Sequence, residues 1–374
     1  MIHLDGHAMG ERIAEARGRA GLTQAELAAA ISVPDRSAMT KIENGSRRVS
    51  ALELAQIADA LGERIEWFVT AVPESIVPHR NLQEPGAAGP TIDRLAELAA
   101  RNLEFLAEHD DRLMLEAGAN LSRPATMGEA ERAATEAREL LHLADEEPLS
   151  NISERTATLG MFGFSFAMGN DAADAASILL ATGGMAIVNG SLQVGRRRLA
   201  MAHELGHYLF ADEYTVDWRV AEHSDDNVWE SRLDRFARAM LLPPKGLSEM
   251  WTRLRSDDGD LRTAAVRTAS AFRVDMSTLA RRLRELALVD QSEANAIRIV
   301  RTTKADIVEF NLVVRDELEA PWLARRYEES VLRLYRREVV SAARATDLLF
   351  DTWSEDDLPV LPALPESQIW NFVS

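Results

Sequence analysis

The stretch Arg198-Leu-Ala-Met-Ala-His-Glu-Leu-Gly-His-Tyr-Leu-Phe210 decides how the central part of the chain folds. Its apolar residues recur at helical spacing, and His203 and His207 are four positions apart, so both imidazoles project from one face of the predicted helix. Two imidazoles at this spacing suit one Zn²⁺ ion, and Glu204 beside the first of them can abstract a proton from a metal-bound water. The pattern predicts a helix that carries part of a metal site.

The remaining ligand of this site has to be a histidine or a carboxylate, because the chain contains no cysteine. A carboxylate at Glu230 completes a two-His, one-Glu site and leaves the fourth position open for water. Asp234 follows one helical turn later and can accept the outer N–H of a ligand histidine, which fixes its tautomer. We assign Glu230 as a ligand and Asp234 as the carboxylate that supports it, whereas a lone helix acid is usually solvated.

Three short apolar runs precede the helix that carries the histidines, at 159–166, 177–181 and 185–189. Their length and composition predict strands, and Thr182-Gly-Gly184 predicts a turn that makes the last two a hairpin. From residue 196 onward the apolar spacing is helical again, and it remains so through 312–322. The sequence therefore predicts an α+β fold that is mostly helical and contains one small sheet.

The N-terminal part of the chain shows five short helical segments within residues 9–70. Helices are expected to begin at Thr23, Asp35 and Ser50, and Gly21 and Gly45 stand where helices must end. A small core is expected from Ile13, Leu27, Ala28, Ile42, Leu54, Ile57 and Leu61. Short helices joined by short turns favour an all-α helix-turn-helix domain over residues 1–72.

The runs Leu22–Ala28, Met39–Gly45 and Ser50–Leu61 resemble the XRE family of Cro-type repressors. The resemblance implies a recognition helix near Arg36–Asn44 in the major groove of a double-stranded DNA operator. Between residues 35 and 50, four Arg and Lys outweigh two acids, which gives the positive face that phosphate contact requires. The candidate DNA-binding residues are Gln24, Arg36, Ser37, Thr40 and Lys41.

One such unit reads a single half-site, so specific binding is expected to need a homodimer. The alternative is that the helix-turn-helix fold mediates protein contacts only, which the acidity of the whole chain would favour.

A second resemblance rests on the helix with the two histidines, the strand Ala186–Asn189 and the run Glu230–Pro243. These look like the ImmA/IrrE family of zincin metallopeptidases, and Ala271–Leu283 resembles the closing helix pair of that family. The likeness covers residues 126–290. It implies a gluzincin-like zinc metalloendopeptidase whose protein substrate is an XRE-type repressor or a similar partner.

The family's mechanism carries over onto the residues named above. It implies Zn²⁺ on His203, His207 and Glu230, with Glu204 as the catalytic base. By analogy, the strand at 185–188 is expected to align an extended substrate by edge pairing. Tyr208, Tyr214 and His223 lie nearby in sequence, and each is better read as a packing or surface residue than as an oxyanion stabiliser.

The sequence divides into five expected segments. These are a helix-turn-helix domain at 1–72, a Pro- and Gly-rich linker at 73–90, a helical connector at 91–125, the peptidase domain at 126–290 and a helical C-terminal region at 291–374. Prolines remove backbone donors and glycines cost entropy to order, so the linker is not expected to form regular structure.

Composition limits the function further. The 374 residues are 46% hydrophobic and 27% charged, as in globular proteins, and the net charge of −18 excludes a general nucleic-acid coating protein. Residues 1–72 hold eight Lys and Arg against ten Asp and Glu, so most of the excess negative charge lies further along the chain. No apolar run approaches the ~20 residues that span a bilayer, and the lack of cysteine fits a reducing compartment. We expect a cytoplasmic protein without a membrane partner.

Three hypotheses about function remain at this point. The first is a transcriptional regulator with a zinc-dependent endopeptidase domain that cleaves a repressor or partner protein in a stress, phage or mobile-element response. The second is a non-proteolytic regulator or antitoxin-like protein whose zinc site is structural or sensory. The third is a protease that cuts its own linker at 73–90. Glu204 favours the first, because a structural site needs ligands but no general base.

Overall fold

The structure is a computed structural model of the chain. It describes residues 6–31, 36–61, 65–69, 90–113, 115, 120–169, 172–180, 182–211, 215–217, 228–257, 260–312 and 316–361. The chain forms two compact units, residues 1–77 and 78–374. Within the described residues, no helix combines the length and apolar character needed to cross a membrane. Most of the predicted linker at 73–90 lies outside the described residues.

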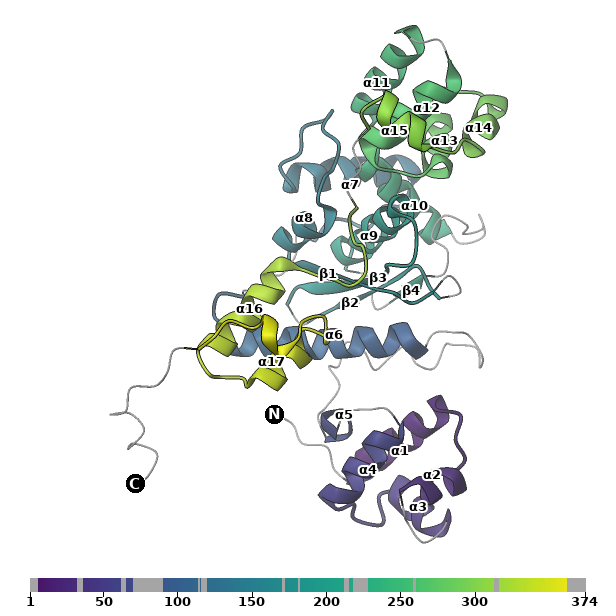
Figure 1. Cartoon of the computed structure of the whole chain (residues 1–374). Helices are drawn as coiled ribbons and strands as arrows, with labels where there is room; N and C mark the ends of the chain where they lie inside the picture. Colours follow the sequence, from purple (N-terminus) through teal and green to yellow (C-terminus); the bar gives the residue numbers. More distant parts are fainter. Residues whose placement is uncertain are drawn as a thin grey trace. The chain divides into compact units, whose positions relative to one another are not determined.

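The first unit consists of short helices, as predicted (Figure 1). They are α1 (Gly6–Arg19), α2 (Gln24–Ala30), α3 (Arg36–Glu43), α4 (Ala51–Leu61) and α5 (Ile65–Val69). A capping box starts α2, because the Thr23 hydroxyl accepts the Glu26 N–H and the Glu26 carboxylate accepts the Thr23 N–H. The predicted core residues are buried together, and Gly10 lets α1 approach α3, since a Cβ there would lie 2.4 Å from the carbonyl oxygen of Glu43.

The second unit is built on a mixed five-stranded sheet in the order β4-β2-β3-β1-β5. The strands are β1 (Met161–Phe166), β2 (Ala175–Leu179), β3 (Gly184–Asn189), β4 (Thr215–Asp217) and β5 (Trp322–Leu323). β1 runs parallel to β3, and β2 and β3 form the predicted antiparallel hairpin. The sequence did not indicate β4 or β5, which are too short to produce a strand pattern.

The position of β3 corrects one expectation. β3 pairs with β1 on one side and with β2 on the other, so it has no free edge on which a substrate could add a strand. Every residue of β3 is buried, which agrees with its continuous apolar run and with a central strand covered on both faces. Edge pairing by the strand at 185–188 is therefore wrong, and the outer strands of this sheet are β4 and β5.

Helices cover both faces of the sheet (Figure 1). On one side lie α7 (Met127–Leu140), α8 (Ile152–Thr158), α9 (Val194–Leu209) and α10 (Val228–Leu241). On the other lie α6 (Pro90–His109), α16 (Arg325–Arg336) and α17 (Ala342–Leu348). α9 packs between the sheet and α10, which explains why nearly all of its residues are buried.

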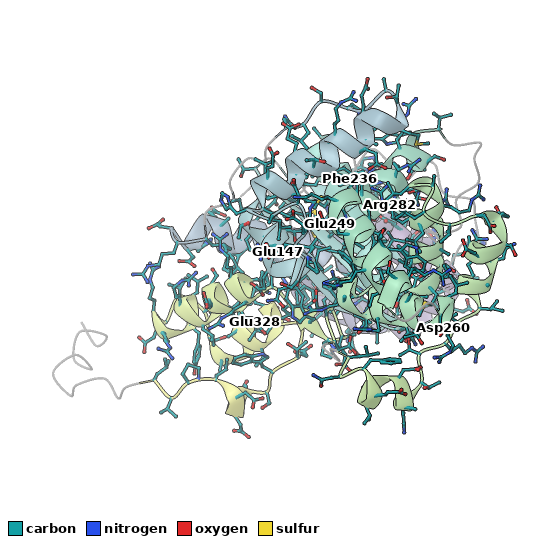
Figure 2. The ribbon with its side chains drawn as sticks, turned by 90° about the horizontal axis from the view of Figure 1, so that it is seen from above. Glu147, Phe236, Glu249, Asp260, Arg282 and Glu328 are labelled. Atoms are coloured by element: carbon teal, nitrogen blue, oxygen red, sulfur yellow. The ribbon has the colours of Figure 1, made fainter. Side chains whose placement is uncertain are left out.

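A further group of helices packs beside α10 and α7. It contains α11 (Pro244–Asp257), α12 (Leu261–Phe272), α13 (Met276–Glu285), α14 (Gln291–Arg298) and α15 (Lys304–Glu309), and a 3-10 helix follows much later at Glu355–Asp357. Arg282 of α13, labelled in Figure 2, is completely buried. The predicted connector and C-terminal region lie in the same compact unit as the predicted peptidase segment.

The segment 312–322 is not helical where the structure describes it, contrary to the sequence prediction. It lies instead against the sheet: the Ser165 hydroxyl donates to the Leu318 carbonyl oxygen at 2.7 Å, and Trp322 pairs with β1. Pro321 has no N–H to give to a helix, and Leu318 is buried in the core of the second unit. Helical spacing of a few apolar residues was therefore misleading here.

Candidate metal centre

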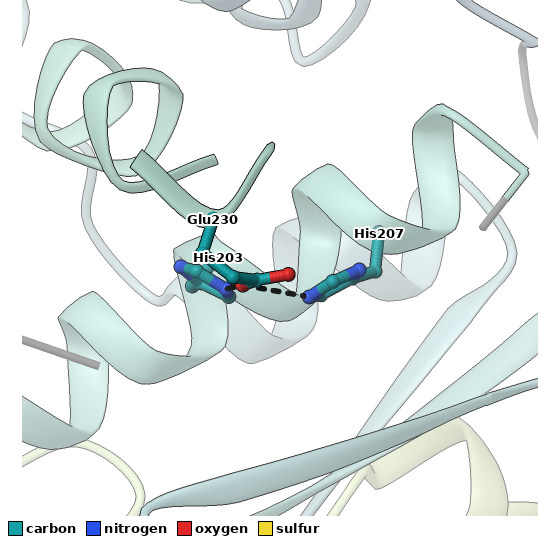
Figure 3. A group of neighbouring side chains, drawn as sticks. All are labelled: His203, His207 and Glu230. Carbon is teal, nitrogen blue, oxygen red and sulfur yellow. Dashed lines mark hydrogen bonds and ion pairs between the residues drawn. The ribbon is translucent and has the colours of Figure 1, made fainter. Parts of the chain in front are cut away.

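His203, His207 and Glu230 meet where α9 and α10 cross (Figure 3). The two histidines project from one face of α9, and Glu230 comes from the first turn of α10. Glu230 Oε2 lies 3.1 Å from His203 Nε2 and 3.8 Å from His207 Nε2. All three side chains are buried.

This arrangement fits a zinc ion. One atom of each side chain lies within 4.8 Å of the other two. Ligands at ordinary Zn–N and Zn–O distances around a tetrahedral ion stand about 3.4 Å apart, and the measured separations bracket that spacing. Two imidazoles and one carboxylate are also a donor set that zinc accepts in catalytic sites. The residues could thus hold the ion with one position left for water.

Close packing of α9 on α10 brings the three side chains together. A Cβ at Gly206 would lie 2.9 Å from Leu233 Cδ2 and 3.1 Å from Phe236 Cδ1, so glycine permits this approach. Leu233 and Phe236 are fully buried on the face of α10 that meets α9. The glycine inside the His-Glu-x-x-His pattern therefore helps to place Glu230 against the histidines.

Asp234 lies one turn after Glu230, where the sequence placed it. Its Oδ1 atom is 3.2 Å from His203 Nδ1, the ring nitrogen that faces away from the cluster. Its Oδ2 atom is 3.4 Å from an Arg238 guanidinium nitrogen. Burial raises the pKa of Asp234, but the contact with His203 and the charge of Arg238 outweigh it, so the pKa lies below its ordinary value. An ionised Asp234 can hold the His203 tautomer whose Nε2 faces the cluster.

Glu204 is fully buried on α9 beside His203. Tyr208 donates its hydroxyl to the Leu159 carbonyl oxygen at 2.9 Å, which makes it a packing residue, as expected. Tyr214 and His223 lie outside the described residues.

The predicted DNA-binding residues gather on one face of the first unit. Arg36, Ser37, Thr40 and Lys41 are exposed on α3, and Gln24 is half-buried at the start of α2. Gln24 Oε1 accepts the Thr40 hydroxyl at 3.1 Å and Arg36 Nε at 3.4 Å. The structure therefore brings Gln24, Arg36 and Thr40 together where α2 contacts α3.

Sequence reasoning missed the residues that hold Gln24. Glu43 Oε2 accepts Gln24 Nε2 at 2.7 Å, and Glu43 Oε1 accepts Arg17 Nε at 2.6 Å. Glu43 is buried and lies 26 residues from Arg17. No short-range pattern could reveal this network. The available signal was that Glu43 lies on the buried face of a predicted helix, because a buried acid needs a hydrogen-bonding or charged partner.

Two family models match the chain. A helix-turn-helix domain model matches residues 8–63, and an IrrE N-terminal-like domain model of a peptidase family matches residues 170–284. The chain joins a helix-turn-helix domain to an IrrE-like peptidase domain. The predicted fusion and the predicted fold class are thereby confirmed, and the metal cluster lies within the second match.

Other comparisons add little to this assignment. No curated protein matches the chain. A crystal structure of Bacillus thuringiensis PlcR in complex with a peptide and DNA shares 11% identity over 91% of each chain, with a TM-score of 0.18. That score is too low to carry an argument. The two domains support a regulator with a DNA-binding domain and a metallopeptidase domain that uses a metal cofactor.

Proposed function

We propose that this chain is a DNA-binding transcriptional regulator whose second unit is a zinc-dependent endopeptidase that cleaves a repressor or another partner protein. The observation that carries the proposal is the buried cluster of His203, His207 and Glu230, with Glu204 on the same helix. The proposal places the activity in the reducing cytoplasm, which agrees with the lack of cysteine in the sequence.

His203, His207 and Glu230 would hold the zinc ion, and Asp234 would fix the tautomer of His203. Zinc bound there supplies a Lewis acid for the scissile carbonyl and for the attacking water. The Glu204 carboxylate takes the proton from that water and delivers it to the leaving amine nitrogen. Burial of Glu204 and of the histidines keeps bulk water away from these proton transfers.

In the first unit, α3 would enter the major groove with Arg36, Ser37 and Thr40 toward base edges and Lys41 toward phosphate. The hydrogen bonds from Thr40 and Arg36 to Gln24 fix the orientation of these side chains in the absence of DNA. A homodimer would supply the second half-site.

The decisive variant is Glu204→Gln, because it removes the base and leaves the three ligands in place. We expect about one zinc per chain in both proteins, and loss of cleavage by at least a hundredfold in the variant. Zinc is measured by plasma mass spectrometry, and cleavage of an XRE-type repressor by intact-protein mass spectrometry. Glu230→Ala, which should lose zinc, is the control for the ligand set.

The burial of His203, His207 and Glu204 also fits a second candidate, in which zinc is structural or sensory and nothing is cleaved. In that case wild type and Glu204→Gln would bind zinc and DNA equally, and neither would cut any protein. Fragments ending within residues 73–90 in aged, zinc-loaded wild type would instead indicate self-cleavage. If the wild-type protein binds no zinc after reconstitution, both the protease hypothesis and the structural or sensory zinc hypothesis are wrong.

A further inference from the structure

A chain of charged side chains leads from the metal centre to α13. His203 Nδ1 lies 3.2 Å from Asp234 Oδ1, and Asp234 Oδ2 lies 3.4 Å from Arg238 Nη1. Arg238 Nε then donates to Glu285 Oε1 at 2.9 Å. Asp234 is 1% exposed and Arg238 3% exposed, so water screens this chain weakly. A ligand on α9 is thus connected to the last turn of α13 through two residues of α10.

Arg238 binds both acids with one rigid group. A guanidinium is a rigid plane, so the bond to Glu285 also fixes the orientation of the group whose Nη1 lies 3.4 Å from Asp234 Oδ2. The Asp234 carboxylate lies between the two groups, with Oδ2 near the Arg238 guanidinium and Oδ1 near the His203 ring. The outer partner of a ligand histidine determines how its ring is oriented toward the metal.

Arg235, on the same helix, provides a comparison for Arg238. It lies one turn from Arg238 and pairs with Glu285 at 3.0 Å and with Glu131 at 3.1 Å. Its partners thus belong to the same network, whereas Arg238 alone of the two also contacts Asp234. The two arginines form a matched pair for experiment.

We propose that Arg238 is a positioning residue of the metal centre, which transmits the placement of α13 to His203 through Asp234. The inference rests on the proposed metal site. It assigns α13 a role in metal binding although α13 supplies no residue of the His203, His207 and Glu230 cluster.

The test is Arg238→Lys, which keeps the charge but replaces the planar fork with a single ammonium. Because the charge is conserved, a change in metal affinity reports orientation rather than electrostatics. We expect the zinc dissociation constant, measured by chelator competition on the full chain, to rise about tenfold, the lower end of the range for outer partners of metal ligands. The visible spectrum of the Co²⁺-loaded protein should shift as well. Arg235→Lys should change neither quantity.

A second pair of variants approaches Arg238 from α13. Glu285→Gln weakens the anchor of Arg238 without altering Asp234, whereas Glu131→Gln removes an acid that pairs with Arg235 and Arg282. We expect the Co²⁺ spectrum to shift in the first and to stay unchanged in the second. If Arg238→Lys does not fold, this second pair of variants tests the positioning role of Arg238 instead.

The outcomes separate this inference from the proposed function. Wild type that binds neither Zn²⁺ nor Co²⁺ would overturn the metal site itself. Wild type that binds zinc, with Arg238→Lys indistinguishable from Arg235→Lys in affinity and spectrum, would overturn the role of Arg238 alone.

Discussion

Glu317 anchors the beginning of α9, the helix that carries His203 and His207. Its carboxylate binds the guanidinium groups of Arg198 and Arg273, and accepts the Ile152 N–H at 3.2 Å. Arg198 is completely buried. Burial raises the pKa of Glu317, but the charges of Arg198 and Arg273 and the backbone donors outweigh it, so the pKa lies below its ordinary value. The charged form of Glu317 therefore belongs to the folded protein.

We predict that Glu317→Gln lowers the free energy of unfolding of the second unit by about 3–5 kcal/mol, because it leaves two arginines without their carboxylate. Urea unfolding followed by tryptophan fluorescence measures the loss. Glu319→Gln changes an exposed acid two positions away and should cost less than about 0.5 kcal/mol. Equal losses in the two variants would contradict the assigned role.

The same lowered pKa gives this prediction a pH signature. A carboxyl group whose folded pKa is lowered contributes stability above its unfolded pKa, near 4.3 for Glu. That contribution disappears as the pH falls through the folded pKa. The difference in unfolding free energy between wild type and Glu317→Gln should thus be largest near pH 6 and shrink below about pH 4. A difference that persists unchanged at pH 3 would exclude the ionised carboxylate as its source.

At the scale of elements, α9 could be predicted from the sequence because its information is local. Histidines at i and i+4 share a face whatever surrounds the helix, and the Glu230 and Asp234 pair repeats that spacing on α10. The Asp234 contact with His203 follows from the same rule once α10 packs on α9. Helical geometry alone was therefore enough to predict His203, His207, Glu230 and Asp234 as site residues.

Other elements depend on distant partners, so the sequence did not indicate them. β5 exists because two residues pair with Ser165 and Phe164, far away in the chain. The Glu131 bonds to Arg282 span 151 residues, and the Arg238 bond to Glu285 spans 47. Charged residues on helices are usually solvated, so nothing local distinguished Arg238 and Arg282, which are buried.

For α3, the proposed recognition helix, we predict that one substitution changes DNA affinity in general and another changes sequence specificity. Lys41→Ala should weaken binding to all DNA sequences alike and reduce the slope of log K against log salt by about 1. Arg36→Ala should reduce binding to the chain's own upstream DNA more than binding to random DNA, by about 1–3 kcal/mol. Fluorescence anisotropy at several salt concentrations measures both. Identical effects of the two variants on specific and random DNA would place Arg36 on phosphate.

For the whole molecule, the two compact units differ in charge as well as in structure. Residues 1–72 are close to electrically balanced, whereas most of the net charge of −18 lies in the remainder. A negatively charged second unit repels DNA, which agrees with the proposal that the first unit makes the DNA contacts. Each unit has a hydrophobic core of its own, so each should unfold as its own cooperative transition.

We predict that zinc and DNA stabilise different transitions of the full chain in differential scanning calorimetry. A ligand that binds only the native form of one unit stabilises that unit, by about 2.7 kcal/mol at a free concentration one hundred times Kd. Zinc should raise the transition of the second unit alone, and Glu230→Ala should abolish that shift. DNA from the chain's own upstream region should raise the transition of the first unit alone. If either ligand raised both transitions together, binding at one unit would be energetically coupled to the other, and the operator would then control the peptidase directly.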